Sequence, residues 1–83
     1  MPKLKQLSGK KLIKIMAILG FEVYSQKGSH IKLKKTTVSK QEQTITIPNH
    51  PELDKGTIKA IIRQLSQYIS IDEINEEFYT KEK

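Results

Sequence analysis

One stretch, residues 26–34, constrains the fold more than any other part of the chain. It reads Gln-Lys-Gly-Ser-His-Ile-Lys-Leu-Lys. Gly28 predicts a tight hairpin turn, because glycine readily adopts the positive φ that such turns require. After the turn, Ile31 and Leu33 alternate with polar residues, which predicts a strand with one buried face. The opposite, open face of that strand would carry His30, Lys32 and Lys34.

The composition bounds the size of the protein and its kind of partner. A length of 83 residues predicts one small domain over residues 1–83. Because the chain has no cysteine, disulfides, thiolate metal sites and a cysteine nucleophile are excluded. The net charge of +6 favours a polyanionic partner, usually nucleic acid, although lysines also serve solubility alone.

The sequence also bears on location and cofactors. No segment is long enough to span a membrane. The absence of cysteine fits a reducing compartment, so we expect a cytoplasmic protein. Only two histidines are present, without metal-ligand spacing, and we expect neither a metal ion nor another cofactor.

Periodicity and capping residues predict a helix over residues 9–19. Ser8 is a suitable N-cap, and Gly20 favours the left-handed conformation that ends helices. Alternation predicts three strands after it, over residues 21–26, 29–35 and 44–47, with a polar loop over 36–43. In the first strand we expect Phe21 and Val23 to face the core and Tyr24 and Gln26 to face solvent.

Two more helices are expected near the C-terminus. Gly56 opens the first of them, with Thr57 as its N-cap and an apolar stripe that includes Ile58 and Leu65. Ser70 and Glu73 form a capping box for a short acidic helix over about 71–79. The apolar side of that helix would consist of Ile71, Ile74 and Phe78.

These elements define an α+β fold. The strands form a three-stranded antiparallel sheet that is apolar on one face only, so both main helices should pack on that face. The order is α-β-β-β-α with a short C-terminal helix, and the other face of the sheet stays open to solvent.

The chain resembles the HicA-type toxins, small ribonucleases of toxin–antitoxin pairs. The resemblance covers roughly residues 7–66. It rests on Ser8-Gly9 before a lysine-rich helix, Leu19-Gly20-Phe21 at its end, Gln26-Lys27-Gly28-Ser29-His30 at the hairpin and Gly56-Thr57-Ile58 at the second main helix.

The resemblance implies a double-stranded-RNA-binding-like fold and metal-independent cleavage of mRNA. It implies neutralisation by a HicB-type antitoxin. It also implies that His30 is the catalytic residue and that the turn at Gly28 and Ser29 positions it.

The residues themselves support this chemistry and leave alternatives open. A histidine can serve as general base or acid near neutral pH, and neighbouring lysines can stabilise charge on phosphate. Without the resemblance, His30 would read as an ordinary surface residue, and His50 reads as a residue that stabilises its loop. The candidate RNA-binding residues are Lys10, Lys11, Lys14, Tyr24, Gln26, Lys32, Lys34, Lys59 and Arg63. A non-catalytic RNA-binding module of the same fold is the alternative function.

Overall fold

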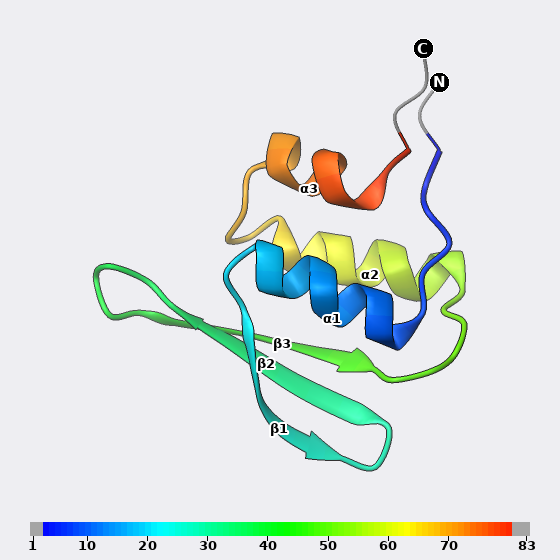
Figure 1. Cartoon of the computed structure of the whole chain (residues 1–83). Coiled ribbons are helices and arrows are strands. Elements are labelled where there is room, and N and C mark those ends of the chain that lie inside the picture. The colour runs from blue at the N-terminus through cyan, green and yellow to red at the C-terminus, as the bar shows by residue number, and fades with distance from the viewer. Residues whose placement is uncertain (1–2, 81–83) are drawn as a thin grey trace.

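A computed structural model describes residues 3–80 and confirms the α+β fold (Figure 1). The helices and strands follow the predicted order: α1 (Gly9–Ile18), β1 (Glu22–Lys27), β2 (His30–Thr36), β3 (Glu42–Pro48), α2 (Lys55–Leu65) and α3 (Ile71–Phe78). Residues 1–2 and 81–83 of the predicted domain lie outside the described residues. The strands β2 and β3 reach further into the predicted loop than expected, which leaves residues 37–41 as the turn.

The three strands form one antiparallel sheet with β2 in the centre. A two-residue turn, Gly28-Ser29, joins β1 to β2, and Gly28 has φ 60°. Glycine at the first of two turn positions matches the hairpin geometry that fits the twist of the flanking strands. The turn therefore fixes where β2 begins, and β2 begins at His30.

The core lies between the sheet and two helices. Alternate residues of β2 and β3 are buried, namely Ile31, Leu33, Ile45 and Ile47. In Figure 1, α1 and α2 lie side by side over this face of the sheet, and α3 lies on the far side of the two helices. The predicted packing of both main helices on one face is thus confirmed.

The first strand departs from simple alternation. Val23 pairs with Leu33 but Ser25 pairs with Lys32, so one extra residue, Tyr24, lies between the two pairs as a β-bulge. Val23 lies on the core face as expected, because it pairs with the buried Leu33, but its side chain stays 45% exposed since β1 is an edge strand. Phe21, just before β1, is buried as expected.

The helix ends show which capping predictions hold. Ser8 caps α1 as predicted, and its Oγ accepts from the N–H of Lys11 at 3.2 Å. The N-cap of α2 is Asp54, so the prediction of Thr57 is wrong. Thr57 instead donates its backbone N–H to Asp54 Oδ1 at 2.7 Å. Hydrogen bonds from the Thr57 side chain and backbone hold the pKa of the Asp54 carboxyl below its ordinary value.

The third helix adds a layer that the apolar pattern predicts only in part. Ser70 caps it as expected, and Ile74 and Phe78 are fully buried. Ile71 is 58% exposed, so its predicted place in the apolar side is wrong. It is the first residue of the helix and lies beyond the core that Ile74 and Phe78 enter.

The two ends of the described chain lie against each other. Leu4 and Tyr79 form an isolated antiparallel bridge. The N–H of Lys5 donates to the carbonyl of Phe78 at 2.9 Å, and the N–H of Thr80 donates to the carbonyl of Lys3 at 2.7 Å. This pairing holds the N-terminal segment beside the end of α3, as Figure 1 shows.

Candidate active site

His30 lies on the open face of the sheet, at the first position of β2. It directly follows the Gly28-Ser29 turn and its side chain is exposed. Its neighbours across the sheet are Lys27 on β1 and Pro48 on β3. Directly opposite residues share one face of a sheet, so the Lys27 side chain stands beside the imidazole.

The sequence pattern missed Lys27 as a site residue. Strict alternation along β1 places Gln26 on the face of His30 and Lys27 on the other. The bulge at Tyr24 reverses this order, because one extra residue shifts the register by one. Nothing in the local sequence marks the bulge, since the segment Val23-Tyr24-Ser25 contains no glycine.

The predicted position of Gln26 is correspondingly wrong. Gln26 pairs with Ile31, whose side chain enters the core, so Gln26 belongs to that face of the sheet. Its side chain remains exposed because the end of β1 is uncovered. Its Nε2 donates to the carbonyl of Gly28 at 3.4 Å, which braces the turn.

The other open-face residues lie at increasing distance from His30. Lys32 is two residues along β2, or about 7 Å, and Lys34 is four residues along, or about 13 Å. The ammonium of Lys34 lies 5.3 Å from the centre of the Tyr24 ring. That contact places Tyr24 on the open face as predicted. It also holds the Lys34 ammonium at the Tyr24 ring, away from His30.

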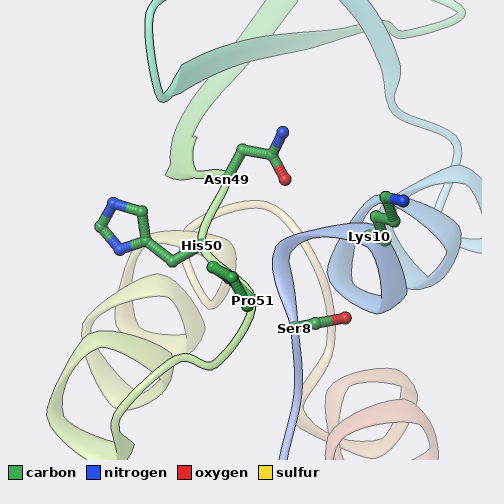
Figure 2. A pocket seen from close by; sticks show the side chains of 5 residues that line it. All are labelled: Ser8, Lys10, Asn49, His50 and Pro51. Atoms are coloured by element: carbon green, nitrogen blue, oxygen red, sulfur yellow. The ribbon is translucent and has the colours of Figure 1, made fainter.

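A hollow of about 420 Å³ lies beside this end of the sheet. Ser8, the N-cap of α1, and Lys10 in α1 line one side of it, and Asn49, His50 and Pro51 line it from the segment after β3 (Figure 2). The imidazole of His50 is exposed, and in Figure 2 it points to the side opposite Lys10. His50 therefore belongs to the wall of a hollow near the site.

Backbone contacts tie this hollow to the hairpin that carries His30. The N–H of Asn49 donates to the carbonyl of Ser29 at 2.6 Å, and the N–H of Gly9 donates to the carbonyl of His50 at 2.8 Å. Asn49 therefore links the turn before His30 to the start of α1. A shift of this segment would move the hairpin and the hollow together.

The predicted helix residues separate into two groups. Lys10, Lys11 and Lys14 are exposed on α1 and line the hollow above or the two beside it. Lys59 and Arg63 are exposed on α2 and line none of these hollows. The structure thus joins the α1 lysines, and not the α2 pair, to the surface that leads toward the hairpin.

Metal-ligating and membrane-spanning features are absent from the part of the chain that the structure describes. Across residues 3–80, no three His, Asp or Glu side chains gather as a metal site would need. Within the same range, no helix has the length and apolar character that would be needed to cross a bilayer.

The arrangement suits chemistry on a phosphodiester. An accessible imidazole can accept or donate a proton, and it stands beside the ammonium of Lys27 with Lys32 one pleat away. Fixed positive charge on an open surface can attract and hold a phosphate.

Comparison with known protein families identifies a toxin family that matches most of the chain. The family model described as the HicA toxin of bacterial toxin–antitoxin systems matches residues 9–66. The match begins at the first residue of α1, ends just after α2 and includes the hairpin with His30. Neither the curated proteins nor the solved structures contain a significant match.

Proposed function

The chain belongs to the HicA toxin family of bacterial toxin–antitoxin systems, and we propose that it acts as an endoribonuclease on mRNA without a metal cofactor. His30 is the catalytic residue in this proposal. The observation that carries it is the position of His30: exposed, fixed by a two-residue turn and paired across the sheet with a lysine.

The reaction needs few protein groups, because RNA supplies its own nucleophile. His30 removes the proton from a ribose 2′-OH, and the 2′-oxygen attacks the adjacent phosphorus. The bond from phosphorus to the 5′-oxygen of the next nucleotide breaks, and that oxygen takes up a proton from His30 or water. The products are a 2′,3′-cyclic phosphate and a 5′-OH end.

The lysines supply the electrostatic part of the proposal. Negative charge builds on the phosphate oxygens as the 2′-oxygen attacks, so a cation near these oxygens lowers the barrier. Lys27 is the best placed, since opposite residues in a sheet have Cβ atoms about 5 Å apart. Lys32 is the next cation along the same face.

A protein partner belongs to the proposal because a toxin of this kind is paired with an antitoxin. We expect a HicB-type antitoxin with an acidic or polar surface that covers His30 and its neighbouring lysines. Opposite charge would speed association with this basic protein. A complex that leaves His30 open and cleavage undiminished would contradict this arrangement.

The decisive experiment is a cleavage assay on single-stranded RNA in the presence of a chelator. The wild-type protein should give 2′,3′-cyclic phosphate ends. A DNA strand of matching sequence should remain intact, because it lacks the 2′-OH that attacks the phosphorus. His30→Ala should lose cleavage while keeping the wild-type circular dichroism spectrum, because the side chain is exposed. Cleavage by folded His30→Ala at the wild-type rate would refute the catalytic role.

The same assay separates the alternative function. A wild-type protein that binds RNA but never cleaves it would be a non-catalytic RNA-binding module of the same fold. The exposed α1 lysines would serve that function equally well, so binding alone does not distinguish the two.

A further inference from the structure

A chain of hollows runs along the N-terminal segment, residues 3–8. Four hollows of about 420, 410, 480 and 710 Å³ lie there, and each shares lining residues with the next. Ser8 and Pro51 join the first to the second, Leu7 and Lys11 join the second to the third, and Lys5 joins the third to the fourth. We call this series of adjoining hollows the N-terminal groove.

The fold builds this groove from segments far apart in the sequence. The bridge between Leu4 and Tyr79 holds its outer end against the end of α3. Further along, the N–H of Leu53 donates to the carbonyl of Leu7 at 2.9 Å. The outer part of the groove, residues 3–8 with Thr80, lies outside the region matched by the family model.

The lining of the groove is strongly basic. Six lysines line it, namely Lys3, Lys5, Lys10, Lys11, Lys14 and Lys55. Against them stands one carboxylate, that of Glu52. Lysine is depleted in the centres of protein–protein interfaces, whereas rows of lysines are the usual footprint of a nucleic-acid backbone. The charge of the groove therefore favours a polyanionic strand over a protein segment.

The inner end of the groove leads to the candidate active site. The hollow lined by Ser8 and Asn49 is its last part, and Asn49 donates its N–H to Ser29, the residue before His30. A strand that lies in the groove would leave it at the catalytic hairpin.

We propose that the N-terminal groove binds a single RNA strand through its phosphates and guides the strand to His30. The part of this inference that concerns delivery rests on the proposed function. Residues 3–8 span at most about 17 Å, which corresponds to about five stacked nucleotides. No Phe, Tyr or Trp side chain lines the four hollows, and their lysines would contact the phosphates, so we expect the groove to be tolerant of base sequence.

The test measures binding with RNA that cannot be cleaved. Two fluorescent, fully 2′-O-methylated single strands serve as probes, one of about twelve and one of about four nucleotides. The variants are Lys5→Gln and the double variant Lys3→Gln/Lys5→Gln. The matched control is Lys40→Asn, which removes one charge from the turn between β2 and β3, and asparagine tolerates the positive φ of 64° there. That turn lies at the opposite end of the molecule from the N-terminal segment, residues 3–8 (Figure 1).

For the long strand, the slope of log K against log salt should fall by about 0.7 in Lys5→Gln and by about 1.4 in the double variant. Lys40→Asn should keep the wild-type slope. The short strand fits either in the groove or at the hairpin end, so its slope should fall by no more than that of the long strand.

Two results would overturn the groove: an unchanged slope for the long strand in the double variant, or an equal loss of slope in Lys40→Asn. If the double variant binds an acidic antitoxin more weakly than wild type does but binds RNA equally well, the groove belongs to a protein partner instead. Because the probes are not cleaved, RNA binding by the groove is measured separately from ribonuclease activity. If the groove binds RNA but the protein has no ribonuclease activity, the proposed function is refuted and the groove proposal stands.

Discussion

Asn49 occupies the space that a side chain at position 9 would need. A Cβ on Gly9 would lie 2.6 Å from Asn49 Oδ1 and 2.7 Å from Asn49 Cα, closer than real Cβ atoms approach other atoms. The backbone of Asn49 cannot move away freely, since its N–H is bonded to Ser29. The absence of a side chain at Gly9 therefore lets the start of α1 pack against the segment that supports the Gly28-Ser29 turn before His30.

Gly9→Ala should destabilise the protein by about 1–3 kcal/mol through overpacking. The sign is informative, because glycine-to-alanine changes in helices ordinarily stabilise by about 1 kcal/mol. Gly56→Ala is the matched control in α2, where the nearest atom to a new Cβ is 3.8 Å away, and it should be neutral or stabilising. Urea unfolding measures both changes. A Gly9→Ala protein at least as stable as wild type would contradict the close packing.

Lys27→Gln should lower the rate of RNA cleavage at saturating RNA by about tenfold or more, because Lys27 stands beside His30. Gln26→Ala is the matched control, since the bulge places Gln26 on the other face. It removes only the hydrogen bond to the Gly28 carbonyl, so it should lower the saturated rate less than Lys27→Gln does. Single-turnover kinetics provide the measurement. The reverse result, a slow Gln26→Ala and a normal Lys27→Gln, would mean that β1 alternates without the bulge.

Lys32→Gln and Lys34→Gln should differ from each other in kinetics. Lys32 is one pleat from His30, so its loss should reduce the saturated rate if it meets charge that develops in the transition state. Lys34 lies about 13 Å along the strand and contacts Tyr24, so its loss should weaken RNA affinity alone. Single-turnover cleavage across a range of RNA concentrations separates the two effects. If both variants lower the saturated rate equally, distance from His30 along β2 does not decide which lysine acts in the transition state.

Phe78→Ala should lower the free energy of unfolding by about 3–5 kcal/mol, because the ring of this last residue of α3 is fully buried. Ile71→Ala removes an exposed side chain of the same helix and should change stability by about 0.5 kcal/mol or less. Phe78→Leu should give a smaller loss than Phe78→Ala, which keeps the test readable if the alanine variant fails to fold. Urea unfolding would count against the packing of α3 if Phe78→Ala matched Ile71→Ala.

The pH dependence of stability should carry a contribution from Asp54. Hydrogen bonds from Thr57 lower its pKa in the folded protein below the ordinary value of 3.8. The carboxylate therefore stabilises the fold above that value, and the stabilisation disappears as the pH falls through the folded pKa. Asp54→Asn keeps an oxygen acceptor without the charge. The stability difference between wild type and Asp54→Asn should shrink on acidification below about pH 4, and a constant difference would contradict the shift.

The sequence by itself determined the features that depend on near neighbours along the chain. Ser8 and Ser70 cap their helices as predicted because a cap is a contact over three residues. Gly28 forms the hairpin turn because glycine, which has no Cβ, adopts a φ of 60° without steric cost. The alternation of Ile31 and Leu33 then fixed both the buried face and the exposure of His30.

Only the tertiary structure decided which residues stand beside His30. The bulge at Tyr24 arises in the pairing of two strands, so no single-strand pattern reveals that Lys27 replaces Gln26 as the neighbour of the imidazole. The dock of Asn49 against Gly9 and the bridge of Leu4 to Tyr79 likewise join residues distant in the chain. Local sequence preferences act over a few residues, whereas the register of a ladder and the meeting of two termini are set by the packing of the whole domain.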